Sequence, residues 1–144
     1  MSASPALVYL HGFNSSPASQ KVRELKSLLP RLSPNLELVV PRLAFDPDAA
    51  FHSACKALDQ LCGRQVGVVG SSLGGYYATA LTQRYDVRAA LINPAVYPWR
   101  LLSHYLGAQY NPYTGEHYQL TSDHMAALQA LDAGTDQHPE RLLL

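Results

Sequence analysis

The stretch VVGSSLGGYYA, residues 68–78, constrains the fold more than any other part of the 144-residue chain. Its apolar start favours a buried strand, and the residues after Gly74 favour a helix. Gly70 and Gly74 stand on either side of Ser72, where a sharp strand-to-helix turn leaves no room for larger side chains. We therefore predict a strand, a tight turn that presents Ser72, and a helix that continues to about Arg84.

Segments with strand and helix character alternate over the first two thirds of the chain. Apolar runs typical of strands occupy residues 6–10, 36–40, 65–69 and 87–92. Such alternation predicts one three-layer α/β domain over residues 1–144, with helices on both faces of a parallel sheet. The expected strand order is 2-1-3-4, the order of small doubly wound folds.

Two helix starts carry capping signals. Ser16 followed by Pro17, and Asp46 followed by Pro47, each read as an N-cap with proline at the first helical position. The last residues, RLLL, predict the beginning of a fifth strand at the edge of the sheet. An exposed apolar edge there would allow self-association by pairing with another chain.

The regular alternation stops before residue 97. The segment 97–118, YPWRLLSHYLGAQYNPYTGEHY, is rich in aromatic residues and broken by proline and glycine. We expect a short helix and an irregular excursion, followed by a helix over 122–131, so that residues 97–131 form a lid-like or cap-like covering. The aromatic residues either line an acyl pocket or simply cover the rim of the sheet, and both interpretations stay open.

Composition restricts the class of partner. Eleven basic and eleven acidic residues balance, so no global field favours nucleic acid or an anionic membrane. No apolar run is long enough to span a bilayer, and the start of the chain lacks the features of a signal peptide. Cys55 and Cys62 stand seven residues apart in one predicted helix, about 10 Å, too far for a disulfide. We interpret them as reduced core thiols and expect a cytoplasmic protein whose partner is a small molecule or another protein.

The motif Gly-x-Ser-x-Gly points to nucleophilic chemistry. In a strand-to-helix context its central residue, Ser72, is presented for attack on a carbonyl carbon. The oxyanion that forms needs backbone N–H donors, and the residue after the nucleophile, Leu73, supplies one. The segment LHGFNSS, residues 10–16, supplies Phe13 as the second donor, and we assign His11 a loop-shaping role beside Gly12. The alternative is a glycine-rich turn that binds a phosphate, although the lysine of a P-loop is absent.

Several longer motifs, YLHGFNSSP, GVVGSSLGGYYAT, INPAVYP and NPYTGEHYQL, resemble the YqiA-like bacterial esterases of the α/β-hydrolase superfamily. The resemblance runs from Leu7 to about Leu144. It implies a three-layer α/β-hydrolase fold and an intracellular serine esterase that acts on acyl esters or thioesters without metal or cofactor. It also implies Ser72 as the nucleophile, with Phe13 and Leu73 as oxyanion donors.

The sequence departs from that family in one respect. The resemblance implies a catalytic Asp in a Gly-Asp-Glu turn after the next strand and a His in a later Gly-Asn-His turn, and the chain contains neither. We therefore expect a C-terminally truncated hydrolase. The position after the fourth strand is Asn93, which carries no charge, and we expect His117 and His124 to be solvated rather than surrogate bases. A non-catalytic module that binds acyl or carboxylate ligands is the alternative function.

Overall fold

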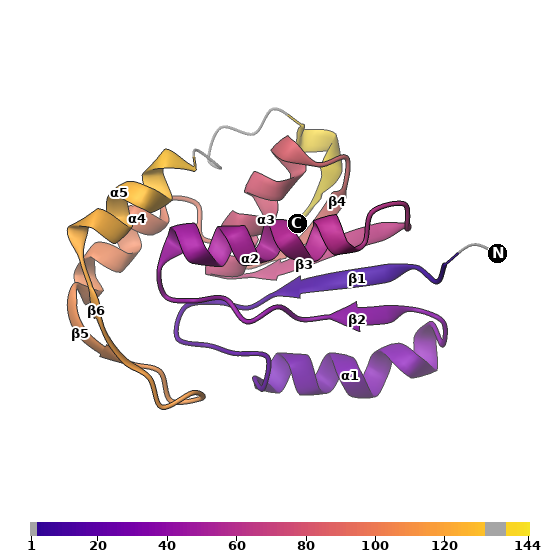
Figure 1. Cartoon of the computed structure of the whole chain (residues 1–144), viewed down its shortest axis with the longest axis horizontal. Helices are drawn as coiled ribbons and strands as arrows, with labels where there is room; N and C mark the ends of the chain where they lie inside the picture. The colour runs from indigo at the N-terminus through magenta and orange to yellow at the C-terminus, as the bar shows by residue number, and fades with distance from the viewer. Residues whose placement is uncertain (1–2, 132–137) are drawn as a thin grey trace.

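The computed structural model describes residues 3–131 and 138–144 of the chain. Its centre is a parallel sheet with the order β2-β1-β3-β4-β7, shown in Figure 1. The strands are β1 (Ala6–Leu10), β2 (Glu37–Val39), β3 (Val66–Ser71), β4 (Arg88–Ile92) and β7 (Leu142–Leu143). The predicted α/β fold class and strand order are therefore confirmed, including the edge strand within the final RLLL.

Three helices connect the first four strands: α1 (Gln20–Leu32), α2 (Pro47–Gln60) and α3 (Leu73–Arg84). Because right-handed crossovers carry the chain first to one edge of β1 and then to the other, α1 covers one face while α2 and α3 share the opposite face. Figure 1 shows α1 and α2 on opposite sides of β1 and β2. The predicted three-layer arrangement follows from this connectivity.

The start of α1 differs from the prediction. The helix is capped by Ser19, whose side chain accepts from the amide of Val22, and not by Ser16. Ser16 is buried and its hydroxyl accepts from the amide of Ala18, 2.9 Å away, which closes a turn before the helix begins. Serine followed by proline suits such a turn as well as a helix start, so the local sequence did not distinguish them. The start of α2 is as predicted, with Asp46 as the cap.

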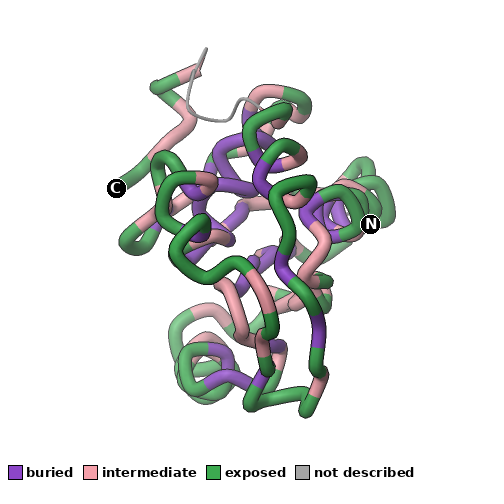
Figure 2. The backbone as a smooth tube through the Cα atoms, turned by 90° about the vertical axis from the view of Figure 1, so that its left-hand side faces the viewer, coloured by how far each residue is buried: buried purple, intermediate pink, exposed green. Residues whose placement is uncertain are grey.

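The core lies between the sheet and the pair α2 and α3. Figure 2 shows the buried residues gathered in the centre of the molecule and the exposed ones on its outer turns. Helix α3 is buried along nine consecutive residues, 74–82, because it is enclosed by the sheet and by neighbouring helices. Val8, Leu10 and Leu81 are wholly inaccessible to solvent.

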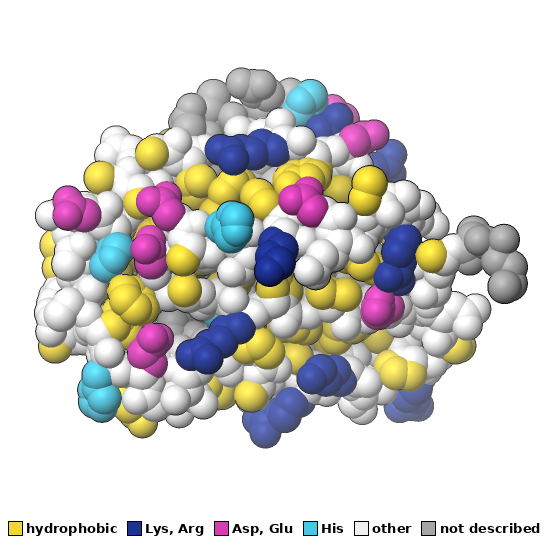
Figure 3. Space-filling view, in the orientation of Figure 1, with side chains coloured by type: hydrophobic (Ala, Val, Ile, Leu, Met, Phe, Trp, Pro, Cys, Tyr) yellow, Lys and Arg dark blue, Asp and Glu magenta, His cyan; other side chains and the backbone are white. Residues whose placement is uncertain are grey.

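The two cysteines are free, and Cys62 is exposed while Cys55 is half-buried. The interpretation of Cys62 as a core thiol is therefore wrong, because it follows the last turn of α2, where the chain leaves the core. Figure 3 shows acidic and basic side chains scattered over one face of the molecule, in keeping with the balanced charge. Over residues 3–131 and 138–144 no helix is long and apolar enough to cross a membrane.

Residues 97–131 contain more regular structure than the sequence predicted. The segment consists of α4 (Pro98–Leu102), the 3-10 turn η1 (Ser103–Tyr105), β5 (Gly107–Tyr110), β6 (His117–Leu120) and α5 (Ser122–Ala130). Strands β5 and β6 pair in an antiparallel hairpin, so the expectation of an irregular excursion is wrong for this part. Figure 1 places the hairpin, α4 and α5 together beyond the carboxyl ends of the strands. A second 3-10 turn, η2 (Pro139–Arg141), precedes β7.

Candidate active site

Ser72 occupies the turn between β3 and α3 with φ 54° and ψ −118°, a conformation that non-glycine residues rarely adopt. Backbone hydrogen bonds hold it there. Its amide donates to the carbonyl of Ile92 at 3.0 Å, and its own carbonyl accepts from the amides of Gly75 and Ala95 at 3.0 and 2.9 Å. The residue is exposed, although its neighbours on both sides are more buried. The structure therefore contains the strained turn that the sequence predicted.

The glycines of the motif are required by space. A Cβ atom on Gly74 would collide with the Leu10 carbonyl oxygen and would lie 2.7 Å from the carbonyl oxygen of His11. A Cβ atom on Gly70 would lie 2.7 Å from the Cα atom of Gly75. In both cases the obstacle is backbone, which cannot move aside as a flexible side chain can. The first turn of α3 thus packs directly on the end of β1.

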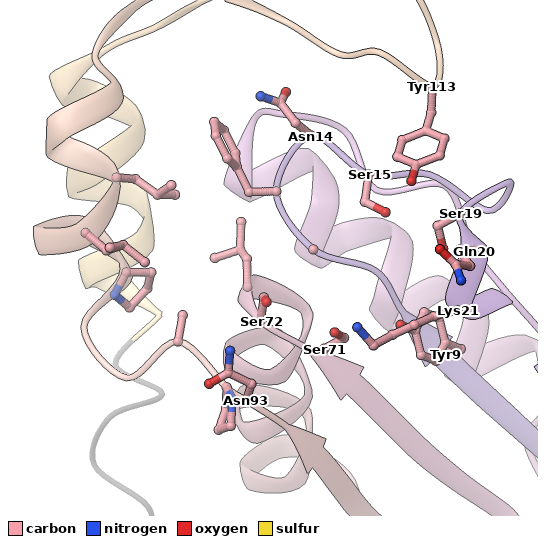
Figure 4. Close-up of a pocket in the computed structure, with 18 of the residues that line it drawn as sticks. Tyr9, Asn14, Ser15, Ser19, Gln20, Lys21, Ser71, Ser72, Asn93 and Tyr113 are labelled. Atoms are coloured by element: carbon pink, nitrogen blue, oxygen red, sulfur yellow. The ribbon is translucent and has the colours of Figure 1, made fainter.

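A cleft of about 910 Å³ opens beside Ser72 at the carboxyl ends of the strands. The loop after β1 contributes Gly12 and Phe13, the turn after β3 contributes Ser72 and Leu73, and the loop after β4 contributes Asn93. Figure 4 shows the side chains of Ser72 and Asn93 next to each other at the ends of β3 and β4. The structure thus brings Ser72, Phe13 and Leu73 together on one cavity.

The two predicted oxyanion donors have backbone N–H groups that are not used elsewhere in the described part of the chain. Leu73 is the first residue of α3, so its N–H precedes the hydrogen bonds of the helix. In residues 3–131 and 138–144, the backbone hydrogen bonds of turns, loops and helix caps include none that is donated by the N–H of Leu73 or of Phe13. Gly12 brings the two loops close together, since a Cβ atom on it would lie only 3.2 Å from the Ser72 Cβ atom. Phe13 and Leu73 thus line the same cavity as Ser72.

His11 is buried behind this loop, with 3% of its surface exposed. Its Nε2 atom accepts from the amide of Leu43 at 3.0 Å, and its Nδ1 atom lies 3.1 Å from the carbonyl oxygen of Gly12. One nitrogen accepts and the other donates, which is the arrangement of a neutral imidazole. Burial lowers the pKa of His11, and the positive charge of Arg42 lowers it further, while the bond to Gly12 raises it. The ring thus ties the loop after β1 to the segment that follows β2.

None of the six histidines lines the cleft. His124 bonds the amide of Thr121 through Nδ1 at 3.0 Å and so caps α5, and the ring of His117 lies against that of Tyr110. Lys21 and Glu24, both on α1, are the charged side chains among the described lining residues. The cleft therefore presents the Ser72 hydroxyl and backbone N–H groups, but no imidazole among the described residues that line it.

The cleft has an apolar and a polar side. Phe13, Leu73 and the α4 residues Leu101 and Leu102 contribute apolar lining, whereas α1 and β1 contribute polar groups. Figure 4 shows Lys21, Ser71 and Tyr9 grouped on that polar side, away from α4. Burial raises the pKa of Tyr9, and its hydrogen bond with the Ser71 side chain lowers it. A ligand with one apolar and one polar part would match both sides.

Backbone strain is concentrated at this cleft. The three non-glycine residues with positive φ in the described chain are Asn14, Ser72 and Asn93, with φ of 53°, 54° and 45°. All three line the cleft. Such strain costs of order 1–3 kcal/mol per residue and clusters at functional sites. The sequence indicated only Ser72, because asparagine also occurs in ordinary turns.

The sequence profile of the family described as uncharacterised protein family UPF0227, the YqiA-like family, matches residues 6–144. The chain belongs to this family. Within residues 3–131 and 138–144 no group of three or more His, Cys, Asp or Glu side chains is placed to hold a metal ion.

Solved structures support the same fold. A putative hydrolase from Agrobacterium vitis S4 is 20% identical with a TM-score of 0.66, over 89% of this chain and 61% of its own. The mouse α/β-hydrolase domain-containing protein 10 is 14% identical with a TM-score of 0.66, over 88% of this chain and 61% of its own. A putative esterase from Staphylococcus aureus is 21% identical with a TM-score of 0.54, over 91% of this chain and 48% of its own. The chain thus has an α/β-hydrolase fold and spans about half to three fifths of these structures.

Proposed function

We propose that this chain provides the nucleophile and the oxyanion-binding groups of a serine hydrolase that cleaves acyl esters or thioesters. The observation that carries the proposal is the position of Ser72. It lies exposed in a strained turn, on the same cleft as the free N–H groups of Phe13 and Leu73. That three-part arrangement is what attack on an acyl carbonyl requires. The resemblance to hydrolases and esterases supports the reaction class.

The reaction would proceed in two steps. The Ser72 oxygen forms a bond to the acyl carbon, and the carbonyl oxygen becomes an oxyanion that accepts from the Phe13 and Leu73 amides. Collapse of this intermediate breaks the bond to the ester oxygen or thioester sulfur, and the alcohol or thiol leaves with a proton. Water then attacks acyl-Ser72 in the same way, which releases the carboxylic acid and restores the hydroxyl.

The proton of the Ser72 hydroxyl needs an acceptor, and the described residues that line the cleft include no histidine. Without a base the hydroxyl stays protonated near neutral pH and attacks weakly. We therefore expect the 144-residue polypeptide, purified as such, to hydrolyse p-nitrophenyl butyrate slowly. An oxyanion hole without a complete triad accelerates hydrolysis over water by roughly 10³–10⁴.

The decisive experiment detects the covalent intermediate. At pH 9 with p-nitrophenyl acetate, we expect acetylation of Ser72 to exceed that of Ser53, a half-buried serine on α2 whose hydroxyl donates to the Ala49 carbonyl, when both are quantified by peptide mass spectrometry. Ser72→Ala serves as the blank for the Ser72 peptide. Acetylation of Ser72 no faster than that of Ser53 would refute the proposed nucleophile. Ordinary enzyme turnover that disappears in Ser72→Ala would instead refute the argument that a base is lacking.

The absence of histidine among the lining residues also favours a second function, a module that binds acyl or carboxylate ligands without turnover. This alternative predicts saturable calorimetric binding of butyrate together with no selective acetylation of Ser72. Replacement of Leu101, which lines the apolar side of the cleft, by Asp would then weaken the binding.

A further inference from the structure

The loop that carries Phe13 is held by the β5–β6 hairpin. Asn14 follows Phe13 directly and has φ 53°, so this part of the loop requires support. The hydroxyl of Tyr118, on β6, donates to the Asn14 Oδ1 atom at 2.5 Å. The Asn14 side-chain amide in turn faces the Gln109 Oε1 atom on β5 at 3.5 Å. Both contacts bridge about a hundred residues of sequence.

A further bond extends this support to the next residue. The side-chain amide of Asn111 donates to the backbone carbonyl of Ser15 at 3.0 Å. The Oδ1 atom of Asn111 is also occupied, because it accepts from the amides of Tyr113 and Thr114 in the turn of the hairpin. The hairpin therefore contacts both residues that follow Phe13, through side chains of β5, β6 and the turn between them.

The groups that hold the loop are themselves fixed. Tyr118 is 8% exposed, and its ring stacks on Phe45 with centroids 4.4 Å apart and an interplanar angle of 14°. Burial, with the negative charge of Glu116, raises the pKa of Tyr118 to about 12, so its hydroxyl keeps the proton that it donates to Asn14. The Gln109 side-chain amide donates to the Tyr105 carbonyl at 2.6 Å.

The opposite end of the loop has a different anchor. His11 binds the amide of Leu43 and so fixes the residue before Gly12. Phe13 thus lies between a support at His11 and a support at Asn14, and its ring faces that of Tyr105 at 5.9 Å. Two anchors on either side of one amide define its direction, which matters because oxyanion donors act only when they are already aimed at the developing charge.

We infer that the β5–β6 hairpin positions the oxyanion loop, with Asn14 and Tyr118 as positioning residues that fix the Phe13 N–H through their hydrogen bond. The expected effect on the reaction rate rests on the proposed function. The hydrogen bond between Asn14 and Tyr118, and the ordering of the loop by that bond, are independent of the proposed function. The hairpin is then part of the machinery of the site rather than only a cover over the rim of the sheet.

The test is a double-mutant cycle. Asn14→Gly keeps a residue that tolerates positive φ but removes the side chain, and Tyr118→Phe removes only the hydroxyl. We expect each variant to lower the rate of p-nitrophenyl butyrate hydrolysis over buffer by roughly 3- to 10-fold, with KM unchanged. That loss is smaller than the roughly 10²–10³ that deletion of a whole oxyanion donor costs. The double variant loses no more than either single variant, because both remove the same bond.

Tyr110→Phe is the matched control, since Tyr110 lies on β5, is 51% exposed and does not line the cleft. It should leave the rate unchanged. Multiplicative losses in the double variant, or equal losses in Tyr110→Phe, would overturn the inference.

Hydrogen exchange separates this inference from the proposed function. In Asn14→Gly and Tyr118→Phe, the amides of residues 12–16 should exchange faster, while those of β3 keep their protection. If the parent chain shows no acceleration over buffer, the proposed function fails and the exchange result alone tests the hairpin contact. If exchange in residues 12–16 is unchanged in both variants, the hairpin does not hold the loop and the inference fails.

Discussion

Gly74→Ala tests whether the first turn of α3 must touch the end of β1. The new Cβ atom would lie 2.7 Å from the His11 carbonyl oxygen and closer still to that of Leu10, so α3 must shift away from β1. An ordinary contact is about 3.4 Å, and restoring one requires displacement of roughly 1 Å in a close-packed interior. Overpacking of this kind costs about 1–3 kcal/mol, and backbone obstacles place this site at the upper end.

Alanine in a helix recovers about 1 kcal/mol over glycine, so the net loss in the free energy of unfolding is about 2 kcal/mol. With a urea m-value of about 2 kcal/mol/M, the denaturation midpoint falls by roughly 1 M. The control is Gly67→Ala in β3, where the nearest atom to the new Cβ would be Leu7 Cδ1 at 3.5 Å. It should match or exceed the parent in stability. A Gly74→Ala midpoint equal to that of the control would show that the contact is not needed.

Three further expectations follow from single features of the structure. Because φ of Ser72 is 54°, the Ser72→Gly variant should be more stable than Ser72→Ala by about 0.5–1 kcal/mol. At Ser53, within α2, the alanine variant should instead be the more stable one. If urea melts rank the glycine and alanine variants in the same order at both sites, Ser72 is not strained. Burial lowers the pKa of His11 in the folded chain, so as the pH falls the histidine of the unfolded chain is protonated before that of the folded chain. The contribution of neutral His11 to the free energy of unfolding is therefore complete above about pH 6.5 and declines as the pH falls below it. His11→Gln should reduce the decline of the urea midpoint below about pH 6.5. If the decline is unchanged in this variant, groups other than His11 cause it. Leu143 on the edge strand β7 is 71% exposed, and we propose that two chains associate through this edge. Leu143→Lys should then lower the sedimentation coefficient at high protein concentration, whereas Leu32→Lys on α1 should leave it unchanged.

The parallel sheet and the Ser72 turn could be predicted because their signals are local and unambiguous. A buried parallel strand is a short apolar run, and VVGSSLGG admits few conformations other than a strand, a turn and a helix. The edge strand β7 was also foreseen, although it has only two residues, both paired with β4. These elements depend on the pattern of apolar residues and glycines, which can be recognised in the sequence without knowledge of tertiary contacts.

The hairpin was missed for the opposite reason. In β6 the burial alternates, with Tyr118 and Leu120 buried and His117 and Gln119 exposed, but four residues give a weak period-two signal. The pair Asn111-Pro112 and the later Gly115 marked a turn, and their combination with this alternation was the signal that could have revealed a hairpin. What stabilises it is remote from its sequence: the stacking of Tyr118 on Phe45 and the bonds to Asn14 and Ser15.

The three strained residues reveal how the site is assembled. Asn14, Ser72 and Asn93 follow β1, β3 and β4, which are neighbours in the sheet, so the strain lies at three adjacent carboxyl ends. Each loop is bound to the next. The amide of Ser72 donates to Ile92, and its carbonyl accepts from Ala95 on the far side of Asn93.

On the other side, Gly12 lies close against Ser72, and beyond it the hairpin binds Asn14. The strain in each loop is therefore maintained by a neighbouring element rather than by its own sequence. The proposed oxyanion donors, held in this way, would need no reorganisation when charge develops on a substrate. A change in one of these contacts should consequently alter the rate of the chemical step more than the affinity for the ligand, since the affinity depends on the walls of the cleft.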